Sequence, residues 1–232
     1  MRTELRHAGA QVCFVLLDLD DGERAAARDL AFAAHGDVFV RSFPAGESID
    51  AIYARFAAAA PALLAQAARR ERAPWEQALE RLVPLAGGVD WWLAGSAAVA
   101  ARGIDVAVRD LDVVTSVDGA FALARLLRDH LIEPVTLSDD WIARAFGRAF
   151  LGIRVEWVGG VVVTADTPEP VDFGPAAAAQ LETITFRSRP VRVPPLELQL
   201  AVTRRRGLDE RAAAIEAALR IRKQRESSAR SA

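Results

Sequence analysis

The chain has 232 residues, a hydrophobic content of 52% and a formal net charge of −2. This length and apolar content predict a globular chain of one large or two small domains and exclude a disordered one. A charge near zero gives no overall attraction to nucleic acid or to an anionic membrane. The single cysteine, Cys13, excludes a disulfide framework and a cysteine metal site. This cysteine content favours a reducing cytoplasm, and no segment is long and apolar enough for a membrane span.

Residues 1–86 are predicted to be mostly helical after one strand. Residues 11–17 form a short apolar run with β-branched and aromatic side chains, which is typical of a strand. Apolar spacing then predicts helices over residues 23–35, 48–72 and 74–85. Ser48 is the expected N-cap of the second helix, and Pro61 should break or kink it. Nothing here indicates chemistry, so the region is interpreted as a cover, a specificity lobe or an interface.

Residues 87–223 are predicted to form an α/β (α+β) core, in which a small mixed sheet is flanked by helices. Strands are expected over residues 89–94, 106–115, 134–137, 141–150, 152–158, 183–189 and 191–193. Helices are expected over residues 96–102, 117–131, 195–205 and 209–223. The polar residues 224–232 are predicted to be a frayed tail.

Two acidic residues, Asp110 and Asp112, stand inside an apolar stretch that is predicted to be a strand. Because alternate side chains of a strand point to the same face, both carboxylates should project side by side. Like charges at short range disfavour joint ionisation, so this pair is costly unless a cation neutralises it. A later predicted strand carries Glu156 at its centre.

A Gly95-Ser96 turn precedes the predicted helix 96–102, one connection before the acid pair. A helix N-terminus favours anions, and carboxylates favour hard cations such as Mg²⁺. Together these features indicate a metal-bound phosphate ligand.

The pieces LAGS (93–96), RDLDVVT (109–115) and RVEWVGG (154–160) occur in this order. The order resembles the nucleotidyltransferase superfamily, which has the DNA-polymerase-β-like fold. That family's pattern is a strand, Gly-Gly or Gly-Ser, a helix, Asp-x-Asp on a strand, and a third carboxylate on a following strand. The proline-led C-terminal run 193–219 is similar to the end of minimal bacterial nucleotidyltransferases, including abortive-infection toxins. The resemblance spans residues 89–219.

The resemblance implies a metal-dependent enzyme that transfers an NMP group from an NTP, ATP among them, to an acceptor hydroxyl. Two Mg²⁺ ions would stabilise the attacking and leaving oxygens. The implied metal-binding and catalytic residues are Asp110, Asp112 and Glu156. Glu156 would complete the shell of the catalytic metal and could accept the proton of the hydroxyl. The implied nucleotide-binding residues are Gly95, Ser96, Arg204 and Arg205, with Arg206 as a neighbouring choice.

The sequence leaves the acceptor open among RNA, a protein side chain and a small molecule. It also leaves open an antitoxin partner or a homodimer. A catalytically degenerate nucleotide-binding or toxin–antitoxin interaction module is the alternative function. A third interpretation is an adaptor without a ligand.

Overall fold

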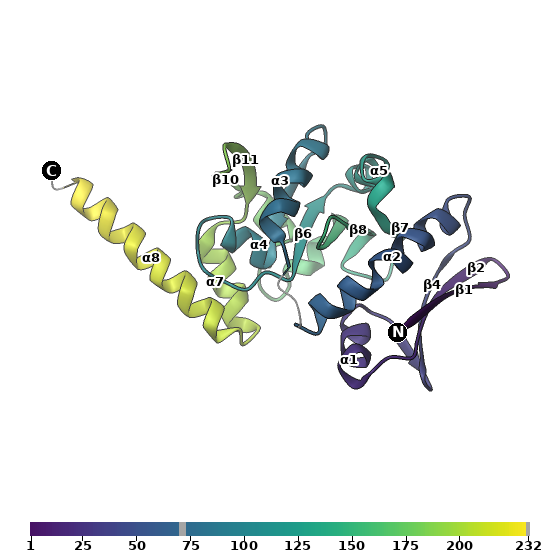
Figure 1. Cartoon of the computed structure of the whole chain (residues 1–232). Helices are drawn as coiled ribbons and strands as arrows, with labels where there is room; N and C mark the ends of the chain where they lie inside the picture. The colour runs from purple at the N-terminus through teal and green to yellow at the C-terminus, as the bar shows by residue number, and fades with distance from the viewer. Residues whose placement is uncertain (70–72, 231–232) are drawn as a thin grey trace.

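A computed structural model describes residues 1–69 and 73–230 of the chain. Its centre is a five-stranded sheet with the strand order β5-β6-β9-β8-β7 (Figure 1). The strands are β5 (Trp91–Ala94), β6 (Asp110–Thr115), β7 (Leu131–Leu137), β8 (Ala143–Phe150) and β9 (Arg154–Val161). β6 and β9 are parallel, whereas the other neighbouring pairs are antiparallel. The predicted mixed sheet and the predicted hairpin of β8 and β9 are both confirmed.

The register of this sheet places charged residues side by side. Asp112 lies opposite Ala94 of β5 on one side and opposite Glu156 of β9 on the other. Asp110 lies opposite Arg154, and Glu156 lies opposite Arg148 of β8. Residues at the same register position share a face of the sheet, so one short stretch of three strands collects these side chains.

The first 86 residues contain a four-stranded antiparallel sheet with the order β1-β2-β4-β3. Its strands are β1 (Arg2–Ala8), β2 (Gln11–Leu17), β3 (Ala33–His35) and β4 (Val38–Pro44). The prediction of one strand followed by helices is therefore wrong. β1 is a polar edge strand without an apolar run, and β3 occupies the end of the predicted helix 23–35.

Three helices accompany this sheet, α1 (Asp21–Asp29), α2 (Ile49–Ala67) and α3 (Trp75–Leu85). Asp20 caps α1, because its side chain accepts a hydrogen bond from the backbone N–H of Glu23 at 2.9 Å. Pro61 lies inside α2 without ending it, so the predicted break at this residue is wrong. Buried residues flank the proline in the helix, and tertiary packing of this kind overrides local propensity. The last part of the predicted helix 48–72, residues 70–72, lies outside the described residues.

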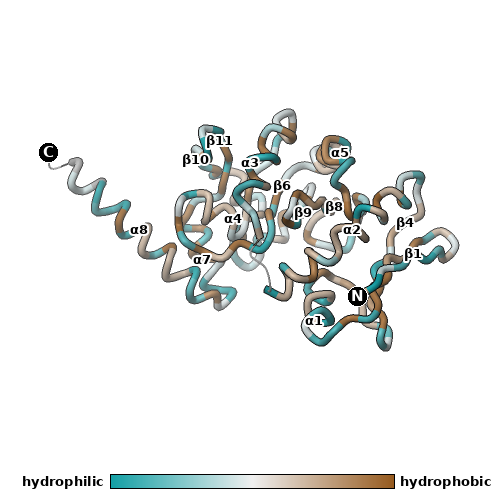
Figure 2. The backbone as a smooth tube through the Cα atoms, viewed as in Figure 1, coloured by the Kyte–Doolittle hydropathy of each residue, from teal (hydrophilic) through white to brown (hydrophobic). Residues whose placement is uncertain are grey.

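The remaining elements surround the central sheet. They are α4 (Gly95–Ala100), α5 (Val117–Leu126), η1 (Arg128–His130), η2 (Val163–Asp166), α6 (Pro175–Ala178), the hairpin β10 (Glu182–Phe186) and β11 (Arg189–Val193), α7 (Leu196–Arg205) and α8 (Asp209–Arg230). α8 projects from the body, and its outer half is largely hydrophilic (Figures 1 and 2). It continues to Arg230, so most of the predicted frayed tail is helical. Among the described residues, no helix combines the length and apolar character needed to cross a bilayer.

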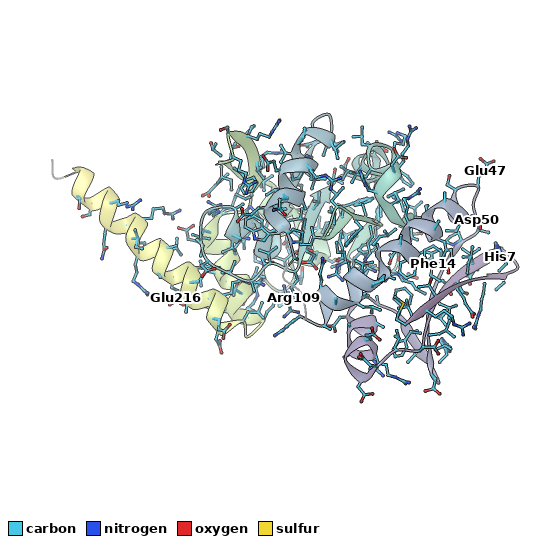
Figure 3. The ribbon with its side chains drawn as sticks, viewed as in Figure 1. His7, Phe14, Glu47, Asp50, Arg109 and Glu216 are labelled. Carbon is cyan, nitrogen blue, oxygen red and sulfur yellow. The ribbon has the colours of Figure 1, made fainter. Side chains whose placement is uncertain are left out.

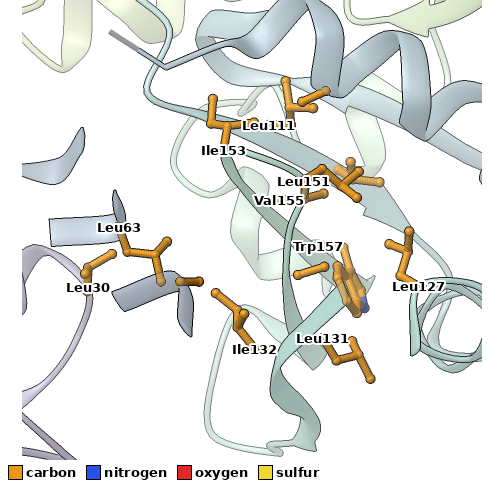
Figure 4. Packing of buried hydrophobic residues seen from close by; sticks show 14 of the residues in the cluster. Leu30, Leu63, Leu111, Leu127, Leu131, Ile132, Leu151, Ile153, Val155 and Trp157 are labelled. Atoms are coloured by element: carbon orange, nitrogen blue, oxygen red, sulfur yellow. The ribbon is translucent and has the colours of Figure 1, made fainter. Parts of the chain in front are cut away.

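One hydrophobic core joins the N-terminal region to the central sheet. Leu30 and Leu63 belong to the same buried cluster as Ile132 and Trp157 (Figure 4). Trp157 is fully buried against Gly147, where a Cβ would lie 2.4 Å from the indole ring. Side chains of α2 also donate to the sheet region, for example Arg55 Nε to the carbonyl of Leu131 at 2.9 Å. Packing is therefore continuous across the predicted boundary at residue 86.

Candidate active site

Three carboxylates converge at the β6–β9 pair. Asp110 and Asp112 leave β6 on one face, and Glu156 leaves β9 opposite Asp112. Each offers an oxygen, and these oxygens all lie within 4.8 Å of one another. All three residues are half-buried. The structure therefore brings together the three residues that the sequence predicted as a cluster.

The cluster carries negative charge that the protein does not fully neutralise. Burial raises the pKa of Asp112 well above its usual range, and the neighbouring charges of Asp110, Glu156 and Asp172 raise it further. The guanidinium of Arg154 opposes this shift. A site with only carboxylate oxygens, short of positive charge, fits a hard divalent cation such as Mg²⁺ or Mn²⁺.

Gly95 is in close contact with the cluster. Its φ of +61° is in the left-handed region, and a Cβ there would lie 2.2 Å from Asp112 Oδ2. Glycine is therefore required both by the backbone conformation and by the space that the carboxylate fills. Ser96 follows in the first turn of α4, where it is buried.

A fourth carboxylate, Asp172, was missed by the sequence analysis. It is 7% exposed and accepts a hydrogen bond from the backbone N–H of Gly95 at 3.2 Å. Burial raises its pKa, although the hydrogen bond from Gly95 opposes this shift. Asp172 lies in an irregular segment before α6, where no periodic pattern marks it. Its role depends on a contact across 77 residues of sequence.

Arg154 contacts two acids of the cluster. It pairs with Asp110 and lies 3.3 Å from Glu156 Oε1 through its Nε. Burial opposes the charge on Arg154, but Glu156 and Asp110 outweigh burial and raise its pKa. This arginine enters the cluster because it is paired in register with Asp110. The sequence analysis quoted it inside RVEWVGG without assigning it a role.

The predicted phosphate-binding residues Arg204 and Arg205 are engaged elsewhere. Arg204 pairs with Glu216 at 2.7 Å, and Arg205 pairs with Glu169 at 2.6 Å. Both pairs lie at the surface, so neither guanidinium faces the carboxylate cluster in this arrangement.

Three other arginines lie near the acids. The pKa of Arg211 is lowered by burial and by the charges of Arg206 and Arg109, whereas Asp172 and Asp112 raise it. Arg206 and Arg211 are thus within electrostatic range of the carboxylates, and Arg109 directly precedes Asp110 in the sequence. Within residues 1–69 and 73–230, no side-chain ion pair is found for Arg109, Arg206 or Arg211. Cations that lack a protein partner next to an acidic cluster are suited to binding an anion.

A cleft of about 920 Å³ opens at this position. One wall comes from the N-terminal region (Gln66, Arg69, Ala73 and Trp75), and the others come from residues 105–109 and 207–211. Figure 3 shows Arg109 between α2 and the first turns of α8. A smaller cavity of about 40 Å³ shares Gln66 and Arg109 with the cleft and is also lined by Arg154, the residue that pairs with Asp110. The cleft is large enough for a nucleotide-sized ligand.

Two solved structures are similar to this chain. One is a candidate nucleotidyltransferase from Thermotoga maritima, with 23% identity and a TM-score of 0.46. The match covers 62% of this chain and 91% of that one. The other is the lincosamide antibiotic adenylyltransferase LnuA with lincomycin bound, with 14% identity and a TM-score of 0.39. This match covers 54% of this chain and 84% of LnuA.

No family model matches the chain, and no curated protein matches it. These two structures are described as a nucleotidyltransferase and an adenylyltransferase, and the sequence motifs resemble the nucleotidyltransferase superfamily. At these identities and TM-scores, the function proposed below rests on the geometry of the site.

Proposed function

We propose that this chain is a metal-dependent nucleotidyltransferase of the DNA-polymerase-β-like superfamily, which transfers an NMP group from an NTP to an acceptor hydroxyl. The observation that carries the proposal is the convergence of Asp110, Asp112 and Glu156, with oxygens within 4.8 Å. Two of the acids leave one strand and the third leaves its parallel neighbour. The motif order and the register of the sheet support the same assignment.

The carboxylate cluster fits a divalent cation by its chemistry and its charge. Asp110 and Asp112 would hold the metal together with Glu156, and burial together with the charges of the neighbouring acids raises the pKa of Asp112. When bound, Mg²⁺ would stabilise negative charge on the phosphate and hydroxyl oxygens that react. We propose that the site binds two Mg²⁺ ions. Glu156 is the residue proposed to accept the proton of the acceptor hydroxyl.

The triphosphate would be held by the arginines that lack partners in the described residues. Arg206 influences the pKa of Asp172, Arg211 is influenced by Asp172 and Asp112, and Arg109 and Arg211 line the same cleft. They replace Arg204 and Arg205 as the favoured phosphate ligands, since the latter two are ion-paired at the surface. Gly95 and Ser96 remain the proposed contacts from the turn before α4, where Gly95 permits a close approach of the backbone.

The acceptor remains a choice among RNA, a protein side chain and a small molecule. The cleft beside the cluster has room for part of an acceptor as well as the nucleotide. We propose ATP as the donor of the NMP group and the cytoplasm as the compartment. We also propose that the chain assembles as a homodimer or with an antitoxin. The N-terminal region would influence the choice of acceptor, because it lines one wall of the cleft.

One observation favours the alternative of a catalytically degenerate nucleotide-binding or interaction module. Arg154 already pairs with Asp110 and lies close to Glu156. A guanidinium in this position supplies positive charge to the cluster without a metal. If it stays in place when nucleotide binds, the chain would bind nucleotide without transferring it.

Transfer from an α-³²P-labelled NTP tests the proposal. The full chain is incubated with each of the four NTPs, Mg²⁺ or Mn²⁺, and total RNA, protein or hydroxylated small molecules as acceptors. We expect label on one acceptor class, and loss of that label in Asp110→Asn and Asp112→Asn. Asp139→Asn is the matched control, because Asp139 is an exposed acid in the loop between β7 and β8 that lines neither the cleft nor the smaller cavity. Nucleotide binding without transfer would favour the module, and full transfer by Asp112→Asn would refute the site.

A further inference from the structure

A row of buried charges links the carboxylate cluster to the N-terminal region. Glu156 accepts a hydrogen bond from Arg148 Nε. Arg148 Nη1 lies 2.8 Å from Glu133 Oε1, and Arg41 Nη2 lies 2.9 Å from Glu133 Oε2. Arg148 is 6% exposed and Glu133 is 3% exposed. The order along the row is therefore Arg41, Glu133, Arg148 and Glu156, with charges of alternating sign.

The N-terminal region holds the outer end of this row. Leu30 is the C-cap residue that directly follows α1. Its carbonyl accepts hydrogen bonds from both Arg41 Nη1 and Arg148 Nη1 at 2.9 Å. The ring of Phe146 lies under both guanidinium groups, 4.8 Å from Arg148 and 5.8 Å from Arg41. Arg41 belongs to β4 and Leu30 follows α1, so two N-terminal elements meet at Arg148.

The register of the sheet aims Arg148 at Glu156. The two residues are cross-strand partners on β8 and β9, and Glu133 of β7 is the partner of Arg148 on its other side. Arg148 Nε donates to Glu156 Oε1, and Arg154 Nε lies 3.3 Å from the same oxygen. Both contacts are to Oε1, so Oε2 is the oxygen that these two arginines do not hold. A carboxylate fixed through one oxygen presents the other in a set direction, as outer-shell partners of metal ligands do.

We propose that Arg148 is the positioning residue for Glu156, and that Arg41 and the Leu30 carbonyl make the N-terminal region a brace for the metal site. This inference rests on the proposed function, because it assigns Glu156 to a cation. It gives residues 1–86 a role in addition to lining the cleft. Asp110 and Asp112 are held next to each other because they share strand β6. The brace fixes the side chain of Glu156, which comes from β9, beside them.

A structural ion pair is the competing explanation for the row. A pair of that kind would contribute to folding and leave cation binding unchanged once the protein is folded. The two explanations therefore differ in the affinity of the folded variant for metal. They also differ in kcat, which a structural ion pair would leave unchanged and a loosened Glu156 would lower. KM for the NTP should change little in either case, because Arg148 is not in the group proposed to hold the triphosphate.

The test uses the full chain and three substitutions. Arg148→Lys keeps a positive charge but loses the fork that reaches Glu133, Glu156 and Leu30 together. Arg41→Met removes the outer cation while keeping a long stem over Phe43 and Phe146. Arg28→Met is the matched control, because Arg28 also lies over an aromatic ring, Phe39 at 5.2 Å, outside the row. Mn²⁺ affinity is measured by titration calorimetry, kcat and KM by labelled-NTP transfer, and folding by circular dichroism.

We expect Arg148→Lys to weaken Mn²⁺ binding by about 10- to 100-fold and to lower kcat, with KM for the NTP within about twofold of wild type. Arg41→Met should change both quantities in the same direction by a smaller factor. Arg28→Met should leave them unchanged. Folded Arg148→Lys and Arg41→Met proteins with wild-type Mn²⁺ affinity would overturn the proposal.

If Arg148→Lys does not fold, Arg41→Met and Glu133→Gln carry the test, and wild-type affinity in both overturns it. Glu133→Gln keeps an acceptor for Arg148 but removes the charge between the two arginines. A failure of the proposed function gives a different result. In that case the wild-type protein itself neither binds Mn²⁺ nor transfers label, before any variant is compared.

Discussion

Replacing Asp112 with Asn should make the metal-free protein more stable and make it unresponsive to metal. Burial, Asp110, Glu156 and Asp172 all raise the pKa of the Asp112 carboxyl. A carboxyl whose pKa is higher in the folded state costs stability as the pH rises above its unfolded pKa, because the unfolded chain then releases the proton more readily. At neutral pH the asparagine avoids this cost. The stability difference between the two proteins should shrink as the pH falls from neutral toward about 4.

The metal response has a magnitude that follows from mass action. A ligand that binds only the folded state stabilises it by about 2.7 kcal/mol at a concentration 100-fold above its Kd. For a chain of about this length, each kcal/mol raises the Tm by roughly 2–4 °C. Mn²⁺ at that concentration should therefore raise the wild-type Tm by about 5–11 °C. Asp112→Asn should show about 1 °C or less, because the cluster loses the charge at its centre.

Differential scanning calorimetry checks both parts of this prediction, with and without Mn²⁺ and across pH. Asp139→Asn serves as the control, since it removes an exposed acid away from both cavities and should keep the full metal response. The reasoning would be refuted if Asp112→Asn were less stable than wild type in chelator. It would also be refuted if Mn²⁺ shifted both proteins equally.

Three further outcomes follow from named contacts. Gly95→Ala should cost about 1–2 kcal/mol in urea unfolding, because φ is +61°, and should also weaken Mn²⁺ binding, because the Cβ meets Asp112 Oδ2. Arg211→Ala should weaken NTP binding about tenfold in equilibrium titration. Arg205→Ala, which breaks a surface ion pair, should change NTP affinity by no more than about twofold. Equal losses of affinity would contradict the assignment of Arg211 as a phosphate ligand. Trp157→Ala should cost about 3–5 kcal/mol by denaturant unfolding, since the indole is fully buried, and a loss below 1 kcal/mol would contradict its place in the core.

The carboxylate cluster was predictable where it depends on a local rule. Asp110 and Asp112 share a face because strands have a period of two. Glu156 was predicted as the third carboxylate from the resemblance in motif order. The parallel pairing of β6 with β9 places it opposite Asp112. Asp172 and Arg148 could not be found this way. Their contacts with the cluster depend on loop placement and on the register of β8.

The N-terminal sheet and the arginines show where local patterns mislead. β1 is mostly polar because it is an edge strand, so it lacks the apolar run by which a strand is recognised. The arginines at 204–206 look equivalent in sequence, but the end of α7 directs Arg204 and Arg205 into ion pairs. Arg206, the first residue after the helix, lies instead near Asp172. Only the tertiary structure separates these neighbours.

The central claim is that Asp110, Asp112 and Glu156 together hold a divalent cation that contacts a nucleoside triphosphate. Anomalous diffraction from crystals grown with Mn²⁺ and a non-hydrolysable NTP tests this most directly. We expect an anomalous peak about 2.0–2.4 Å from oxygens of the three carboxylates and of the triphosphate. Mn²⁺ bound elsewhere, with Arg154 still paired to Asp110 beside a bound nucleotide, would contradict it.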